Sequence, residues 1–131
     1  MIVVDTSAFM AVVLDEDLAG NCSDILAREE EILLSAGTFA EALIVAGRRN
    51  VGEVVAALIE GLGCQVVPVT RRDAENVAGA YAIWGKGVHS AALNDGDCFA
   101  YALAKDRACP LQFVGDDFTR TDIPECIGHQ P

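Results

Sequence analysis

Short apolar runs alternate with helix-like stretches along the whole chain, and this alternation constrains the fold more than any other feature. Four runs have the length of a buried strand. The expected strands are Ile2–Val4, Ile32–Ser35, Cys64–Val69 and Gln112–Gly115. The expected helices are Ala8–Leu14, Leu18–Arg28, Phe39–Arg49, Glu53–Leu62, Arg71–Lys86 and Asp97–Arg107. Strands that alternate with helices predict an α/β fold, in which helices cover both faces of a parallel sheet.

Length and composition fit one folded domain that spans residues 1–131. Apolar residues make up 52% of the chain, which excludes a disordered protein, and no repeat or linker divides the sequence. The longest apolar runs are too short for a transmembrane helix, and the N-terminus lacks the basic leader of a secretory signal. We therefore expect a soluble, cytoplasmic protein without a membrane segment.

The cysteines and histidines argue against disulfide, zinc and histidine chemistry. The cysteines are odd in number and form no Cys-x-x-Cys pair; they are Cys22, Cys64, Cys98, Cys109 and Cys126. His89 and His129 are isolated in the sequence. This pattern fits neither a disulfide framework nor a zinc site, and it gives little support to a histidine-based triad.

The charge balance is strongly acidic. The formal net charge is −11, from 20 acids and 9 bases. Such a chain does not bind nucleic acid through bulk electrostatic attraction, because phosphate contacts require Lys and Arg. Two interpretations stay open: carboxylates gathered around a cation, or an acidic surface that attracts a basic partner.

Acidic residues lie where the expected strands end and where one of the helices begins. Asp5 directly follows the first strand, Glu41 lies in the unit after the second, and Asp97 opens the helix in "LNDGDCFAYALAK". Asp116 and Asp117 follow the last strand in "LQFVGDD". Ligands of open parallel sheets bind beyond the carboxyl ends of the strands. We therefore expect these acids to meet at one edge of the sheet.

A cluster of carboxylates predicts a particular chemistry. Like charges held together are costly unless a cation neutralises them. Oxygen ligands without His or Cys favour a hard ion, Mg²⁺ or Mn²⁺. Such an ion lowers the pKa of bound water and stabilises negative charge on a phosphoryl group. The residues therefore favour metal-dependent phosphodiester hydrolysis.

The first two acids also have local structural interpretations, which the sequence leaves open. Asp5 is a favoured N-cap residue for a helix that begins near Thr6. Thr38 and Glu41 have the spacing of a capping box, in which Thr38 would cap the helix and Glu41 would accept from the cap amide. In both cases the carboxylate would serve helix formation alone.

The later acids have local interpretations as well. Asp97 lies in the first turn of a helix, where a negative charge interacts favourably with the helix dipole, and Asn94 or Asp95 can cap that helix. Asp116 and Asp117 can diverge into solvent from a loop. Each explanation is adequate for a single acid, but none explains why all of them follow apolar strands or open an apolar helix.

The motifs together resemble a known family. "VVDTSA", "T-x-x-E", "LNDGDCFAYALAK" and "FVGDDFTRTDI" are similar, in this order and over nearly the whole chain, to the PIN-domain ribonucleases, and in particular to the VapC-type toxins of bacterial toxin–antitoxin pairs. The resemblance implies a PIN-like three-layer sandwich with a central four- to five-stranded parallel sheet flanked by helices. It also implies that Asp5, Glu41, Asp97 and Asp116 are the catalytic and metal-binding acids, with Asp117 as the alternative to Asp116.

The resemblance further implies an activity and partners. The activity is that of an endoribonuclease dependent on Mg²⁺ or Mn²⁺, and the substrate is RNA. A homodimer is expected, together with a cognate antitoxin that blocks the site with a basic side chain. Thr6 or Ser7 would hold a metal-bound water, and these two residues and Arg120 are the candidates for RNA contact.

The sequence departs from the family pattern near the third acid, at Asp95, Ala92 and Ser90, the last of which stands where a proline is frequent. Asp95 stands where an aromatic or apolar residue is usual, and Ala92 stands where an arginine is frequent. The first change adds a negative charge beside the site, and the second removes a plausible phosphate contact. None of these changes touches the expected metal ligands.

The sequence leaves three alternatives to a nuclease. A PIN-like module without catalytic activity would only bind its partner. A small phosphatase would use Asp5 as a covalent nucleophile, but such enzymes carry a second acid two residues later, where this chain has Ser7. A receiver domain would pair two acids after the first strand and place a lysine after the last, and neither feature is present.

Overall fold

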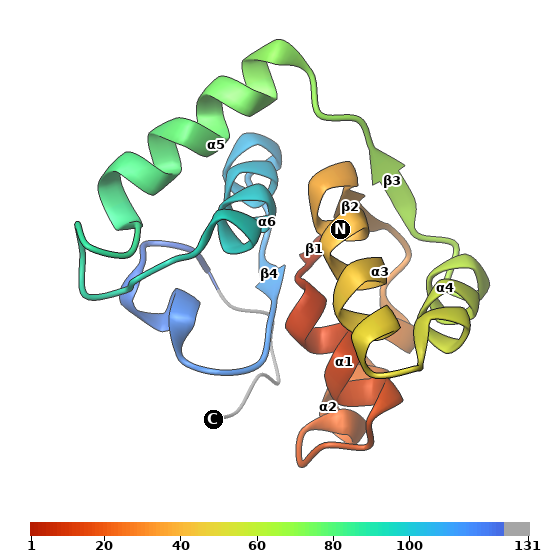
Figure 1. The fold of residues 1–131 in the computed structure, drawn as a ribbon. Coiled ribbons are helices and arrows are strands. Elements are labelled where there is room, and N and C mark those ends of the chain that lie inside the picture. Colours follow the sequence, from red (N-terminus) through yellow and green to blue (C-terminus); the bar gives the residue numbers. More distant parts are fainter. Residues whose placement is uncertain (125–131) are drawn as a thin grey trace.

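The computed structural model describes residues 1–124, so Cys126 and His129 lie outside the described residues. Its centre is a parallel sheet with the strand order β3-β2-β1-β4 (Figure 1). The strands are β1 (Ile2–Val4), β2 (Ile32–Ser35), β3 (Gln65–Val67) and β4 (Leu111–Gln112). All three strand pairings are parallel, as the alternation of strands and helices predicts.

Six α-helices and one 3₁₀-helix complete the described fold. They are α1 (Thr6–Val13), α2 (Ala19–Arg28), α3 (Ala36–Arg48), α4 (Gly52–Gly61), α5 (Arg71–Trp84), α6 (Asp95–Arg107) and η1 (Asp117–Arg120). The six predicted helices are confirmed, with ends that differ by no more than three residues. The α/β three-layer architecture is therefore confirmed, with four strands in the sheet.

Two of the predicted strands are shorter than expected. β3 ends at Val67, and the next residue, Pro68, has no N–H to donate to a strand ladder. β4 covers Leu111–Gln112 instead of Gln112–Gly115, because the backbone N–H of Val114 donates to the Ser7 hydroxyl at 3.0 Å instead of to a neighbouring strand. Gly115 then takes a φ of 102°, which turns the chain away from the sheet.

Alternation along the central strands divides the core into two clusters. Ile2, Val4, Ile32 and Leu34 pack with side chains of α1–α4 on one face. Val3 and Leu33 point to the other face and pack with side chains of α5, α6 and the segment after β4. In Figure 1, α5 and α6 lie on one side of the strands and α1, α3 and α4 on the other. This packing fixes the sheet between its two helical layers.

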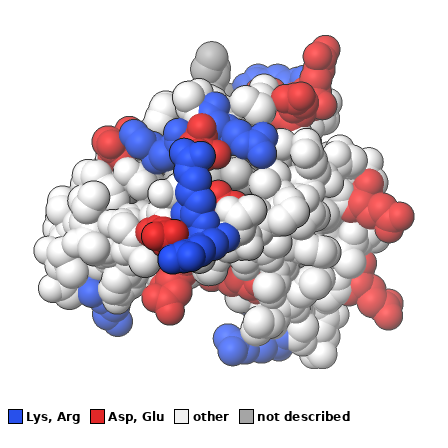
Figure 2. Space-filling model, turned by 90° about the horizontal axis from the view of Figure 1, so that it is seen from above, with Lys and Arg blue, Asp and Glu red and all other residues white. Residues whose placement is uncertain are grey.

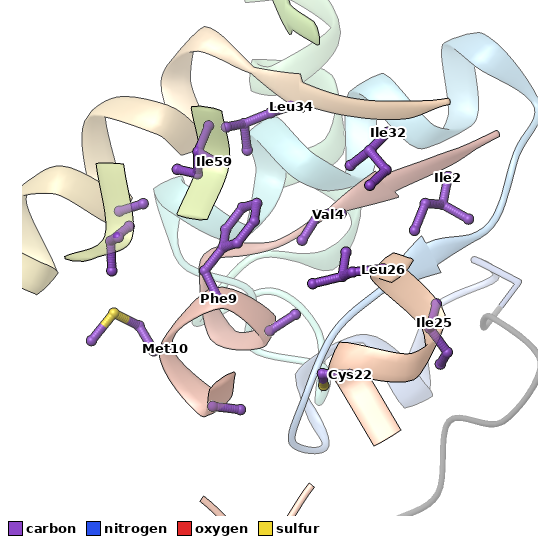
Figure 3. Close-up of a cluster of buried hydrophobic side chains, with 14 of the residues drawn as sticks. Ile2, Val4, Phe9, Met10, Cys22, Ile25, Leu26, Ile32, Leu34 and Ile59 are labelled. Atoms are coloured by element: carbon purple, nitrogen blue, oxygen red, sulfur yellow. The ribbon is translucent and has the colours of Figure 1, made fainter. Parts of the chain in front are cut away.

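Phe9 fills the centre of the first cluster. Its ring lies among Val4, Leu34 and Ile59, which come from two strands and from α4 (Figure 3). The side chain is fully buried. Because α1 follows directly after Asp5, the packing of Phe9 also anchors the start of that helix against the sheet.

None of the helices formed by residues 1–124 combines the length and the apolar character that crossing a bilayer requires.

We expect Phe9→Ala to lower the free energy of unfolding by about 3–5 kcal/mol, because it removes a buried ring and leaves a cavity. Urea unfolding followed by circular dichroism measures the change. The control is Ile83→Ala, whose side chain is 60% exposed and which should change stability by no more than about 0.5 kcal/mol. Equal effects of the two substitutions would contradict this account of the core.

Candidate active site

Asp5 lies at the carboxyl end of β1 and caps α1. Its Oδ2 atom accepts hydrogen bonds from the Ser7 amide at 3.1 Å and from the Ser7 hydroxyl at 2.7 Å. The predicted N-cap role is therefore confirmed. The residue is only 4% exposed, and its other oxygen, Oδ1, is buried without a hydrogen-bond partner. The helix cap thus uses one carboxylate oxygen of Asp5, and the second oxygen is available to a ligand.

Glu41 lies in the second turn of α3, and the capping box predicted for it is wrong. The helix begins at Ala36 and is capped by Ser35, whose hydroxyl accepts from the Gly37 amide at 3.2 Å. Thr38 is thus already inside the helix, where its hydroxyl is buried without a hydrogen-bond partner. The carboxylate of Glu41 instead accepts a hydrogen bond from the Thr6 hydroxyl at 2.7 Å, which connects α3 to α1.

Asp97 lies in the first turn of α6 and takes part in a capping box. The Asp97 amide donates to Asn94 Oδ1 at 2.8 Å, and the Asn94 amide donates to Asp97 Oδ2 at 3.0 Å. Asn94 is therefore the N-cap, and Asp95 is the first residue of the helix instead of its cap. The Asp97 side chain is only 7% exposed, so the capping interaction holds a buried carboxylate in place.

The three acids act on one another electrostatically. Burial raises the pKa of Asp5 from 3.8 to about 6, and the charge of Glu41 adds to this increase. Burial, together with the charges of Asp5, Asp117 and Glu41, raises the pKa of Asp97 to about 7. Acids that are far apart in the sequence therefore repel one another at the carboxyl edge of the sheet, which is the arrangement that the sequence predicts.

The last acid of the predicted set lies in the segment between β4 and η1. Asp117 begins η1, and its charge contributes to the raised pKa of Asp97. Asp116, the residue preferred from the sequence, lines an open groove together with Glu16 and Asp17. Both side chains are exposed. Asp117 is thus the acid of this pair that is shown to act electrostatically on Asp97.

Packing and hydrogen bonds anchor the segment that carries Asp117. Phe118 is buried, and its ring lies 5.1 Å from that of Phe113. The Tyr101 hydroxyl donates to Asp122 at 2.6 Å and itself accepts from the Trp84 indole N–H at 2.9 Å. These contacts connect the segment after β4 to α5 and α6.

The predicted hydroxyl and RNA-contact residues have structural partners. Thr6 donates to Glu41, and Ser7 both donates to Asp5 and accepts from the Val114 amide. The two hydroxyls therefore orient the acids. Arg120 is exposed, and its Nη1 atom donates to the backbone carbonyl of Ser90 at 3.0 Å, which connects η1 to the loop before α6.

The donor set fits a hard divalent cation. All the candidate ligands are carboxylates, and the buried Oδ1 atom of Asp5 lacks the partner that a buried polar atom normally has. A cation would supply that partner and relieve the repulsion that raises the pKa of Asp97. Within residues 1–124, however, no three His, Cys, Asp or Glu side chains already stand close enough together to hold a metal ion. Small side-chain movements would therefore have to accompany binding.

Gly96 lies beside the carboxylate of Glu41 and is not among the residues predicted from the sequence. It is the second residue of α6, and a Cβ atom at this position would overlap the carboxylate of Glu41. The available signal was a poor helix former in the first turn of an otherwise well-formed helix. The side chain that fills the space beside Gly96 comes from α3, which packs against α6. A local sequence pattern cannot predict this contact.

The fold and the site together define an α/β domain with buried acids at the carboxyl edge of a parallel sheet. Residues 2–124 match the PIN domain family. The chain is 40% identical over 129 residues to ribonuclease VapC28 from Mycobacterium tuberculosis, which covers 95% of this chain and 97% of the relative. The chain therefore belongs to the PIN-domain family and, within it, to the VapC group.

Two solved structures have the same fold. The crystal structure of Mycobacterium tuberculosis VapC20, described as a sarcin-ricin loop-cleaving toxin, matches with a TM-score of 0.79 at 17% identity and covers 96% of this chain and 98% of that chain. A toxin–antitoxin complex from Klebsiella pneumoniae matches with a TM-score of 0.72 at 13% identity and covers all of both chains. At these identities the structural likeness concerns the fold.

We expect the metal-free protein to lose stability as the pH rises from about 4 to about 7. A carboxyl group whose pKa is raised in the folded state stabilises the fold below its ordinary pKa of 3.8, and this contribution is lost as the pH rises past about 6 for Asp5 and about 7 for Asp97. In Asp5→Asn, the free energy of unfolding should therefore fall by up to about 3 kcal/mol less over this pH range than in the unmodified protein.

Urea unfolding in the presence of a chelator, repeated across this pH range, measures the effect. Asn can keep the helix cap through its side-chain oxygen, so the variant changes the charge and preserves the local structure. A stability profile as steep in Asp5→Asn as in the unmodified protein would contradict the assigned burial of Asp5.

Proposed function

We propose that this protein is an endoribonuclease that depends on Mg²⁺ or Mn²⁺ and hydrolyses RNA phosphodiester bonds. The observation that carries the proposal is that Asp5 and Asp97 are buried at one edge of the sheet, where they repel each other and the half-buried carboxylate of Glu41. Such an arrangement is costly for the apo protein and becomes favourable when a cation binds. Perturbed carboxylates gathered at the edge where α/β folds bind ligands indicate a functional site.

Each acid of the candidate site would have its own role in the proposed hydrolysis. A divalent cation, when bound, supplies the Lewis acidity that activates water and stabilises negative charge on the phosphoryl oxygens. Asp5 would offer Oδ1 to the cation while Oδ2 stays hydrogen-bonded to Ser7. Asp97 would bind from the first turn of α6. Glu41, held through Oε1 by Thr6, would complete the ligand set or orient the attacking water.

The named relatives support RNA as the substrate class. VapC28 is named a ribonuclease, and the structural neighbour VapC20 is described as cleaving the sarcin-ricin loop. The match to VapC28 extends over 95% of this chain and 97% of that relative, so the likeness concerns the whole domain. The identity of the RNA and the site of cleavage are separate questions from the reaction class.

The surface charge of this chain limits how RNA can bind. Figure 2 shows a face on which Lys and Arg side chains lie among Asp and Glu side chains. Several of the basic side chains form ion pairs with neighbouring acids: Arg71 with Glu75, Arg72 and Arg107 with Asp106, and Lys105 with Asp122. The net charge of the protein would therefore contribute little to RNA binding. A bound cation and local contacts such as Arg120 would contribute more.

We also propose a basic antitoxin partner and a homodimer. The neighbour from Klebsiella pneumoniae is a toxin–antitoxin complex, and a net charge of −11 suits a basic partner segment. Large apolar side chains, including Ile44, Ile83 and Val88, are more than half exposed, and a protein interface can cover such residues.

Asp97→Asn should lower the rate of RNA cleavage by at least about 100-fold, because it removes a charged ligand. Asn can maintain the reciprocal capping interaction with Asn94, so the fold should survive. The measurement is cleavage of a defined RNA pool with Mg²⁺, with Mn²⁺ and with a chelator, alongside circular dichroism of the variant. Cleavage that persists in the chelator or in Asp97→Asn would argue against the metal mechanism.

The same assay distinguishes the two candidates for the fourth acid. We expect Asp117→Asn to lower the cleavage rate by about 10-fold or more and Asp116→Asn to have a smaller effect, because the charge of Asp117 acts on Asp97. The two substitutions are matched in chemistry and in exposure, so each serves as the control for the other. A larger loss in Asp116→Asn would restore the assignment made from the sequence.

A further inference from the structure

Helices α3 and α6 pack against each other through two close approaches. At Gly37 of α3, a Cβ atom would overlap the ring of Phe99 from α6. At Gly96 of α6, a Cβ atom would overlap the carboxylate of Glu41 from α3. Each helix thus provides a glycine against which a side chain of the other helix lies. The second approach involves an acid of the candidate active site.

Most other helical glycines of the chain lack this constraint. A Cβ atom at Gly20, Gly47, Gly61 or Gly79 would meet no atom within 4 Å. Glycine destabilises a helix relative to alanine, so a glycine inside a helix calls for a specific reason. At Gly96 the space that a methyl group would need is occupied by the Glu41 carboxylate, and this supplies such a reason.

We propose that Gly96 is a positioning residue for Glu41, and that its missing side chain allows the Glu41 carboxylate to lie against the first turn of α6, beside Asp97. This inference rests on the proposed function, in which these acids share a cation. The position also places the negative carboxylate at the positive end of the helix dipole of α6. Gly96 would thereby bring an acid of α3 into a site built on β1 and α6.

A methyl group at position 96 has two ways to be accommodated, and both move the carboxylate. The atoms it would meet belong to the end of a flexible side chain, so Glu41 can swing aside, which breaks the hydrogen bond from Thr6 at 2.7 Å. Alternatively, α3 and α6 can separate, which opens the contact between Phe99 and Gly37. The first movement is the cheaper one, so we expect the fold to survive and the cation site to be impaired.

The test is a double-mutant cycle on Mn²⁺ affinity, measured by titration calorimetry on the full chain. We expect Gly96→Ala to weaken Mn²⁺ binding by about 10-fold, the order found when supporting residues around a metal are changed. Glu41→Gln should also weaken binding. If Gly96 acts through Glu41, the double variant should bind no more weakly than Glu41→Gln alone.

Gly79→Ala in α5 is the matched control, because it makes the same substitution in a helix where the added methyl meets nothing. It should leave Mn²⁺ affinity unchanged, and urea unfolding should show that both glycine variants are folded. Additive losses in the double variant, unchanged affinity in Gly96→Ala, or an unfolded Gly96→Ala chain would each overturn the proposal. Absence of Mn²⁺ binding by the unmodified protein would instead contradict the proposed function, and the positioning role with it.

Discussion

The rest of the site depends on the repulsion between carboxylates that the fold buries at one edge of its sheet. Asp5 and Asp97 are nearly inaccessible to solvent, and burial together with neighbouring negative charges raises the pKa of both. Hydrophobic packing on the two faces of the sheet must offset this unfavourable arrangement. A cation bound at this edge would relieve the repulsion, although the carboxylates of residues 1–124 would first have to move closer together.

Helix capping leaves the same acids of this protein free to take up the proposed role in ligand binding. Asp5 caps α1 through Oδ2 and leaves Oδ1 without a partner, while Asp97 exchanges hydrogen bonds with Asn94 at the start of α6. The caps fix the orientation of each carboxylate and thereby reduce the conformational entropy that metal binding would otherwise cost. Local interpretations that compete in the sequence therefore describe two parts of one site.

Much of the fold could be predicted from the sequence, because the signals are local and periodic. Six helices and four parallel strands follow from the alternation of apolar runs, and their errors lie at the ends, as at β4, where Ser7 takes the N–H of Val114. The capping box at Thr38 failed for a similar reason. Ser35, at the end of β2, caps α3 and places Thr38 inside the helix. Spacing alone cannot tell which of two hydroxyl residues begins a helix.

The sequence by itself determined the elements and the parallel sheet, and it predicted that acids gather at the carboxyl edge, because apolar periodicity and chain direction together dictate where strands end. Only the tertiary structure decided which groups meet there. The Thr6 hydroxyl that holds Glu41, the charge of Asp117 that acts on Asp97, and the contact of Glu41 with Gly96 all join distant parts of the chain. Such contacts depend on how α1, α3, α6 and η1 pack in space, and a linear sequence does not record that packing.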